Sequence, residues 1–261
     1  MGTIRYTRED LELFSKASHD KSRLHMSEQY ACQTIYGEPI VFGILGAFAS
    51  LCALSDRHGQ QIATTALDYR LPLYMGVDYQ IETNESAQGR ARVVLKDDRR
   101  TMMTSLFTFR GTRPPDGESD VPAIAPIHEQ ADWKPEELRE DVQVTGRYAP
   151  SPEHLRALIQ RWRLTEKGLT MPQVGVLLWS SYLTGMQLPG LRGTSAQLRL
   201  RFRPEGPGAE TPFDYEARVA EFDERFSLLR TAAKLSGVKG VFADSEVSSH
   251  LRAHTPLPSA R

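Results

Sequence analysis

The chain has 261 residues, of which 40% are hydrophobic and 25% are charged, with a net charge of -1 at pH 7. This ordinary soluble composition can bury one large core or two small ones, which corresponds to one or two domains. The near-zero charge gives no reason to expect bulk attraction to nucleic acid or to anionic lipid.

Membrane insertion and secretion are not expected from the sequence. The opening residues MGTIRYTRED contain no apolar signal core, and the longest apolar run, at 39–54, is too short to cross a bilayer. The two cysteines, Cys32 and Cys52, lie in apolar helical contexts, which fits a reduced compartment better than a disulfide. We therefore expect a cytoplasmic protein.

The first half of the chain alternates short helical segments with polar turns and then changes to strands. The first 54 residues are expected to form a strand at 3–7, a helix at 8–18, a polar turn, a short helix at 27–36 and a buried helix at 40–54. Thr7 is placed to cap the first helix. Apolar residues then recur at every second position, which predicts strands at 62–71, 77–88, 89–98 and 100–110. A buried helix followed by an antiparallel meander indicates an α+β fold, because a sheet can wrap such a helix.

The second half repeats this plan after a segment rich in Pro, Gly and acidic residues. The expected elements are a strand at 139–150, a helix at 152–163, an apolar helix at 174–190 and strands at 194–204, 213–224 and 226–237. The tail at 250–261 is expected to be loose. We therefore predict a duplicated unit, with one domain at 1–112, a linker at 113–134 and a second domain at 135–261.

The polar turn carries an aspartate and a histidine, Asp20 and His25, within the sequence HDKSRLH. One interpretation is a capped turn, in which Asp20 or Ser22 caps a helix and His25 lies on the surface. The other is a proton-transfer site, because a histidine titrates near neutral pH.

The order of these segments resembles the MaoC-like (R)-specific enoyl hydratases and dehydratases, which have the hotdog fold. Their motif runs Gly-Asp-x-Asn-Pro-x-His, then five residues, then Ala. Asp20, His25 and Ala31 match it in register, and PIVFG opens the buried helix that follows. This chain departs from the motif at three positions, with His19 for Gly, Ser22 for Asn and Arg23 for Pro. The second half lacks the Asp/His motif, so the resemblance implies a double hotdog with one active half.

The resemblance also implies roles for individual residues. His25 and Asp20 would activate water, and the backbone N–H of Gly43 would stabilise an enolate oxygen at the start of the buried helix. Gly43 is also open to interpretation as a packing residue. The residues expected to bind substrate are Ser22, Arg23, Phe42 and Ile44. Arg23 could instead pair with Asp20 and lower its pKa, or meet a phosphate at the mouth of the site.

The expected reaction is reversible hydration of a trans-2-enoyl thioester, or dehydration of an (R)-3-hydroxyacyl thioester, carried on coenzyme A or an acyl carrier protein. The carrier thioester acidifies the C2 proton, so no dissociable cofactor is expected. The histidines show no metal-like pairing, so no metal is expected. The alternatives are a hotdog thioesterase, a related addition to an enoyl thioester, or a non-catalytic acyl-binding subunit. A monomeric double hotdog and a homodimer both remain open.

Overall fold

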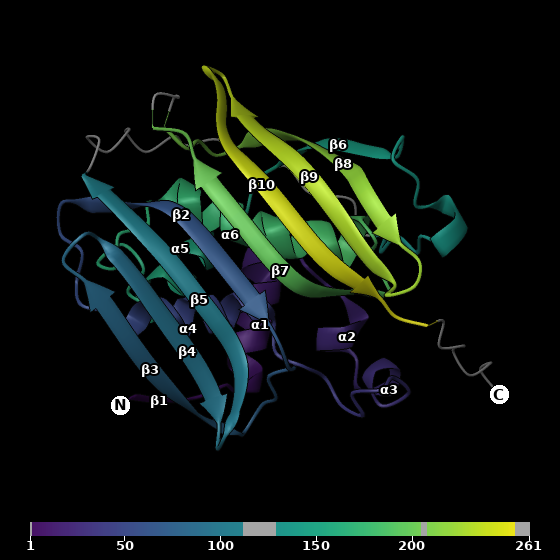
Figure 1. Ribbon diagram of the computed structural model, residues 1–261, viewed down its shortest axis with the longest axis horizontal. Coiled ribbons are helices and arrows are strands. Elements are labelled where there is room, and N and C mark those ends of the chain that lie inside the picture. Colours follow the sequence, from purple (N-terminus) through teal and green to yellow (C-terminus); the bar gives the residue numbers. More distant parts are fainter. Residues whose placement is uncertain (1, 112–128, 205–207, 254–261) are drawn as a thin grey trace.

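A computed structural model describes residues 2–111, 129–204 and 208–253 of the protein (Figure 1). Its strands are β1 (Gly2–Arg5), β2 (Gln60–Tyr69), β3 (Asp78–Ser86), β4 (Arg90–Asp97), β5 (Arg100–Gly111), β6 (Gln143–Tyr148), β7 (Gly193–Phe202), β8 (Phe213–Asp223), β9 (Leu228–Gly237) and β10 (Gly240–Leu251). Its α-helices are α1 (Arg8–Ser18), α2 (Arg23–Met26), α3 (Glu28–Ala31), α4 (Gly43–Cys52), α5 (Pro152–Arg161) and α6 (Met171–Tyr182). A short 3₁₀ turn lies at Pro135–Glu137, and a π-helical turn at Leu183–Gln187 continues α6.

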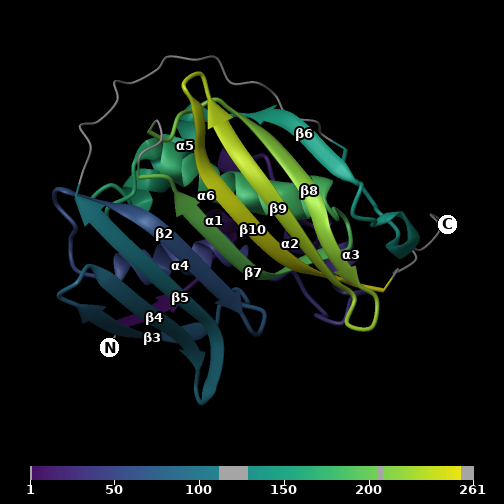
Figure 2. The ribbon, with the colours of Figure 1, turned by 45° about the horizontal axis from the view of Figure 1, so that its top comes forward.

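The ten strands of the described residues form one sheet, in the order β1-β3-β4-β5-β2-β7-β10-β9-β8-β6. Each half contributes five strands in the same internal order, and the halves meet where β2 pairs with β7 in antiparallel fashion. Figure 2 shows the sheet continuing from one half to the other, with β2 and β7 side by side at the junction. The duplicated plan is therefore built as two wrapped units that share one sheet.

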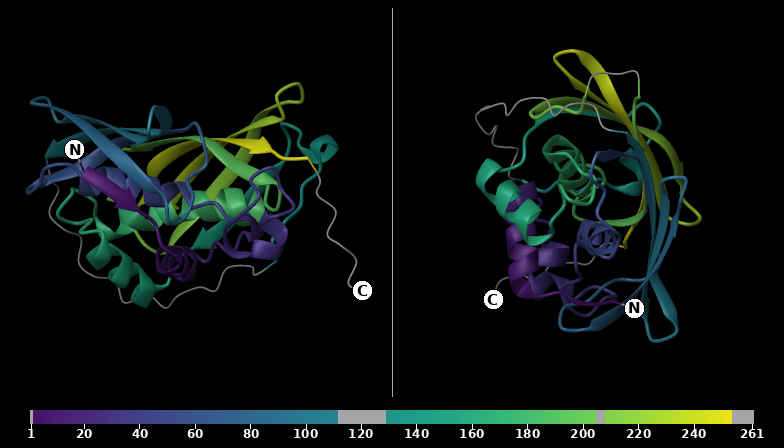
Figure 3. Two further views of the ribbon diagram at one scale, coloured as in Figure 1. Left: turned by 90° about the horizontal axis from the view of Figure 1, so that it is seen from below. Right: turned by 90° about the vertical axis from the view of Figure 1, so that its left-hand side faces the viewer.

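The apolar helices α4 and α6 lie in the concave side of the curved sheet, and α1 and α5 cover them from the other side (Figure 3). Helix α4 is apolar on nearly every face, and its residues from Ile44 to Leu51 are all buried. A helix without a polar face can only be stable when it is surrounded. This layering brings the start of α4 close to the segment after α1 and to α6 of the other half.

Helix α1 begins and ends where local chemistry dictates. The Thr7 hydroxyl accepts from the backbone N–H of Asp10, and the Asp10 carboxylate accepts from the backbone N–H of Thr7, which forms a capping box. At the other end His19 adopts the left-handed conformation, with φ 58°. This is a backbone conformation that glycine adopts without strain and that a residue with a Cβ rarely adopts.

The left-handed conformation at His19 leads to a test of stability. A side chain with a Cβ is strained there by roughly 1–2 kcal/mol, whereas glycine is not. We expect His19→Gly to be more stable than His19→Ala by about 1 kcal/mol, because both variants lose the imidazole and only the alanine keeps the strain. Urea unfolding midpoints at equal slopes measure the difference. Equal midpoints would show that the backbone relaxes away from this conformation.

Most expected elements are confirmed to within a few residues, and two expectations are wrong. The helix expected at 27–36 ends at Ala31, and a separate turn of helix, α2, occupies Arg23–Met26 within the polar turn. The sequence predicts that the loose tail begins at His250. His250 and Leu251 instead belong to β10, which pairs with both β7 and β9. The period-two signal of β10 is weak because serines, Ser245 and Ser249, occupy buried positions on this strand.

The expected linker at 113–134 lies largely outside the described residues. Its described end, at 129–134, packs against the second half. The backbone N–H of Ala131 donates to the carbonyl of Met186 (2.9 Å), and Arg192 donates to the carboxylate of Asp132 (2.7 Å). This part of the chain therefore belongs structurally to the second unit.

Candidate active site

A cavity of about 160 Å³ lies between the two halves of the molecule. Its wall includes Asp20, His25 and Gly43 from the first half and Ser181 and His250 from the second. The three residues expected to carry chemistry, Asp20, His25 and Gly43, therefore line one shared space. Asp20 lies in the short segment between α1 and α2, His25 lies in α2, and Gly43 is the first residue of α4.

Asp20 is 1% exposed, and its carboxylate is held by two donors. The backbone N–H of Ser22 donates to Oδ1 at 3.0 Å, and the hydroxyl of Ser181 donates to Oδ2 at 2.7 Å. Burial raises the pKa of Asp20 to about 7, although both hydrogen bonds act in the opposite direction. The carboxyl can therefore be protonated or ionised near neutral pH.

Of the two alternatives for Arg23, the one in which it pairs with Asp20 and lowers its pKa is wrong. The Arg23 residue is exposed, and no cation contributes to the pKa of Asp20, which is raised and not lowered. The backbone N–H of Arg23 instead approaches the side-chain oxygen of Gln130 at 3.5 Å. Asp20 therefore has no counter-ion among the described residues, and burial without one is why its proton affinity is high.

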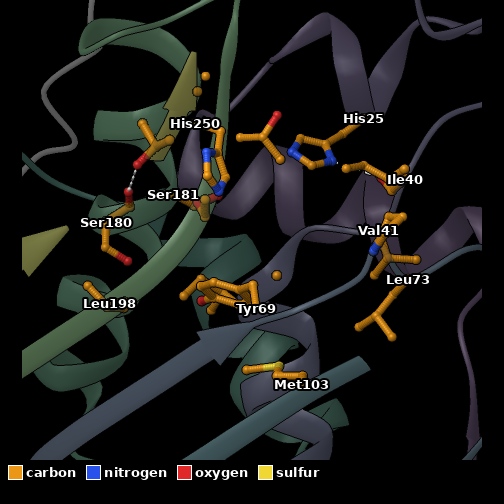
Figure 4. Close-up of a pocket in the computed structure, with 18 of the residues that line it drawn as sticks. His25, Ile40, Val41, Tyr69, Leu73, Met103, Ser180, Ser181, Leu198 and His250 are labelled. Atoms are coloured by element: carbon orange, nitrogen blue, oxygen red, sulfur yellow. Dashed lines mark hydrogen bonds between the residues drawn. The ribbon is translucent and has the colours of Figure 1, made fainter. Parts of the chain in front are cut away.

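The His25 imidazole is fixed in one tautomer by a backbone contact. Its Nδ1 lies 2.8 Å from the carbonyl oxygen of Ile40, and because a carbonyl can only accept, Nδ1 must carry the proton. Figure 4 shows Nδ1 turned toward Ile40 and the other ring nitrogen turned toward the interior of the cavity. Burial lowers the pKa of His25 to about 4, so at neutral pH Nε2 offers a lone pair.

The ring of Phe42 supports the His25 ring from the side. Their centroids are 4.1 Å apart, and Phe42 also packs on Phe14 at 4.5 Å. Phe42 is completely buried and is not part of the cavity wall, so it positions the imidazole and does not contact the expected substrate.

Helix α4 begins at Gly43 with no side-chain cap. The preceding residue, Phe42, has no polar side chain, so the first amides of the helix are not satisfied by a capping oxygen. Gly43 and Ile44 both line the cavity. The positive end of the helix dipole, which has no side-chain cap, thus meets the space that Asp20 and His25 also face.

The sequence matches no protein-family model and no curated protein. Solved structures resemble the fold over nearly its whole length. A MaoC-like dehydratase has a TM-score of 0.69 at 10% identity and covers 95% of both chains. A putative MaoC domain protein dehydratase from Chloroflexus aurantiacus has a TM-score of 0.62 at 11% identity, covering 97% of this chain and 94% of its own. The chain has the double-hotdog fold.

A putative thioesterase from Novosphingobium aromaticivorans is a more distant neighbour. Its TM-score is 0.51 at 13% identity, and the match covers 82% of this chain and 88% of that one. At these identities the likeness establishes the fold alone.

The two central helices of the double hotdog differ at their N-termini. Helix α6 is closed by a capping box, in which Thr170 and Gln173 satisfy each other's backbone N–H groups. Gln173 is also buried and donates to the carbonyl of Ile62 at 2.7 Å. Of these two central helices, α4 has the uncapped N-terminus, and it lies in the half that carries the Asp/His motif. The two halves of the double hotdog therefore differ at the start of their central helices.

The expected substrate contacts are only partly placed in the cavity. Ile44 lines it, whereas Ser22, Arg23 and Phe42 do not. Ser22 is buried and acts through its backbone N–H, which donates to Asp20. Although Ser22 is at the N-cap position of α2, its side chain makes no capping hydrogen bond. The alternative of a capped turn with His25 on the surface therefore does not describe this segment.

Sequence reasoning missed four residues that shape the site: Tyr69, Ser181, Gly185 and His250. The Tyr69 ring lies directly over Gly43, because a Cβ built on Gly43 would be 2.5 Å from Tyr69 Cε1. Figure 4 shows His250 on the opposite side of the cavity from His25. No pattern along the chain links these positions to Asp20, since three of the four lie in the second half.

Among the described residues, no helix is long and apolar enough to span a membrane. Within the same residues, no group of three or more His, Cys, Asp or Glu side chains is arranged to hold a metal ion. Cys32 and Cys52 are both free thiols.

Proposed function

We propose that this double hotdog reversibly adds water to trans-2-enoyl thioesters to give (R)-3-hydroxyacyl thioesters. One observation carries the proposal. A buried carboxyl, a neutral imidazole of fixed tautomer and the uncapped amide end of a helix line a single cavity. These are the three groups that conjugate addition of water to a thioester requires: an acid, a base and a site for the enolate oxygen.

In the proposed reaction Nε2 of His25 accepts a proton from water as the water oxygen bonds to C3. The electron pair of the C2–C3 double bond moves toward the thioester carbonyl, whose oxygen gains negative charge. The backbone N–H of Gly43 donates to this oxygen. Asp20, protonated at the start, delivers its proton to C2. The imidazole then returns its extra proton to the carboxylate through solvent or the next water, which restores the starting state.

The environments of the two titrating groups favour this division of labour. Burial without a cation keeps a proton on Asp20 near neutral pH, and burial keeps His25 neutral. When two neighbouring groups have pKa values pushed apart in this way, the group with the raised value acts as the acid and the other as the base.

The remaining wall fits a short apolar chain. Leu73, Met103 and Leu198 line the cavity together with Ile44. The acyl group would be carried on coenzyme A or on an acyl carrier protein, and no further cofactor enters the proposed reaction. Because the two hotdog units that line the cavity belong to one chain, a monomer would be sufficient for activity.

The direct test incubates the protein with crotonyl-coenzyme A and with longer trans-2-enoyl thioesters. Loss of the enoyl-thioester absorbance, with formation of (R)-3-hydroxyacyl thioester on chiral chromatography, is the expected result. Release of free thiol would identify a thioesterase instead. Binding without turnover on both carriers would identify a non-catalytic acyl-binding protein.

The proposed roles of Asp20 and His25 fix the direction of the pH dependence. The active pair holds one proton, which is on Asp20 before water adds and on His25 afterwards. The pKa of Asp20 is about 7, so deprotonation above this value removes the active form, while His25 stays neutral well below it. We expect kcat/KM to fall about tenfold per pH unit above neutrality, in both directions of the reaction. Initial rates in constant-ionic-strength buffers check this, and a rate that rises through pH 7 would contradict it.

A further inference from the structure

The carboxyl of Asp20 belongs to the first half by sequence, but its surroundings come largely from the second. Ser181, in α6, donates to Oδ2 at 2.7 Å. Gly185, one turn later, lies so close that a Cβ added there would be 2.6 Å from Oδ1 and 2.8 Å from Oδ2. A methyl group cannot occupy that space while the carboxyl is present.

Gly185 is brought to this position by the π-helical turn Leu183–Gln187. The backbone N–H of Leu188 donates to the carbonyl of Leu183 at 2.7 Å, which closes the wider turn. Such turns widen a helix locally and occur often at functional sites. The carbonyl of Gly185 accepts from the side-chain amide of Gln130 at 2.7 Å, so the turn is also held from outside the helix.

The titratable groups near Asp20 are phenols and imidazoles. The negative charge of its carboxylate is therefore stabilised by neutral hydrogen-bond donors. Burial raises the pKa of the Tyr148 and Tyr182 phenols, and the nearby charge of Asp20 raises both further. The Tyr148 hydroxyl is engaged with the carbonyl of Ser18 at 2.9 Å. His25 and His250 line the same cavity. Among the described residues, Ser181 is the one side chain that donates a hydrogen bond to the carboxylate of Asp20.

From this geometry we propose that Ser181 and Gly185 are positioning residues, and that the half without the Asp/His motif builds the socket for the acid of the other half. The proposal rests on the proposed hydratase function for its kinetic consequences, but the socket itself can be tested without turnover. The second unit then has a defined task in catalysis beyond completing the sheet.

The experiment titrates the Asp20 carboxyl by carbon NMR in the full-length chain labelled at the aspartate carboxyl. The resonance is assigned by its loss in Asp20→Asn. Ser181→Ala removes a donor that favours the ionised form, so we expect the Asp20 midpoint to rise by about one pH unit. Ser181→Thr keeps the hydroxyl and should restore the wild-type midpoint.

The matched control is Ser180→Ala. Ser180 is the neighbour on the same helix, and its hydroxyl donates to the carbonyl of Leu177 at 2.7 Å, not to Asp20. This variant should leave the Asp20 midpoint in place. Equal midpoints in Ser181→Ala, Ser180→Ala and wild type would overturn the proposal.

Kinetics on the proposed substrate give a second, separable result. In Ser181→Ala the descending limb of the pH–rate profile should shift to higher pH by the same amount as the NMR midpoint. The kcat of this variant should fall about tenfold. Gly185→Ala should lower kcat about 100-fold by displacing the carboxyl. If wild type hydrates no enoyl thioester, the proposed function fails, while the NMR titration still decides whether Ser181 sets the state of Asp20.

Discussion

Replacing Asp20 with asparagine is expected to lower kcat for enoyl-thioester hydration by roughly 10²–10⁴-fold, the range for loss of a general acid. The amide is nearly the same size as the carboxyl and can keep the contacts to the Ser22 N–H and to Ser181. It cannot deliver a proton to C2. Steady-state absorbance assays at saturating substrate measure the fall in kcat. The KM should change much less than kcat.

Stability provides the control for Asp20→Asn. Because the raised pKa means that the folded state disfavours the ionised carboxyl, the neutral amide should leave the free energy of unfolding unchanged or higher above pH 7. A variant that is folded, equally stable and still fully active would remove Asp20 from the mechanism.

His25→Ala extends the same test. Groups that act as one unit are not additive, so the Asp20→Asn/His25→Ala double variant should be little slower than the slower single variant. Multiplication of the two losses would instead show that the residues act independently and do not share one proton.

The local chemistry of the first half was predictable from the sequence. Features set by residues close together in the chain can be predicted from it. Examples are the spacing of Asp20 and His25, the cap at Thr7 and the uniformly apolar segment before Cys52. Helix α1 has the predicted bounds for this reason. The family resemblance, confirmed at the level of the fold, supplied the expectation that Gly43 would face the same space.

The partners of these residues were not predictable, because they come from distant parts of the chain. Ser181 is 161 positions away from Asp20. In the sequence it is one small residue in an apolar helix. The sequence predicts a loose tail at His250 because the strand that carries it has buried serines at positions where an alternating pattern would have apolar residues. The raised pKa of Asp20 depends on burial by both halves, which no local pattern records.

Gly43→Ala is the second change with a large expected effect. The added methyl would be 2.5 Å from Cε1 of Tyr69, so either the ring or the first turn of α4 must move. Movement of that turn displaces the N–H proposed to stabilise the enolate oxygen. We expect kcat and kcat/KM to fall together by roughly 10²–10³-fold, because this contact matters only once the oxygen gains charge.

Gly46→Ala on the same helix separates this effect from simple crowding. Its added methyl would be 2.6 Å from the sulfur of Met103, which is on a flexible side chain that can shift. Gly46 lies one turn further into α4, where its amide is within the helix and cannot serve the enolate. Assayed with crotonyl-coenzyme A, the shortest substrate, Gly46→Ala should therefore lose far less activity than Gly43→Ala. Comparable losses in the two variants would mean that the cavity is sensitive to crowding along α4 in general, and the special role of the helix N-terminus would have to be abandoned.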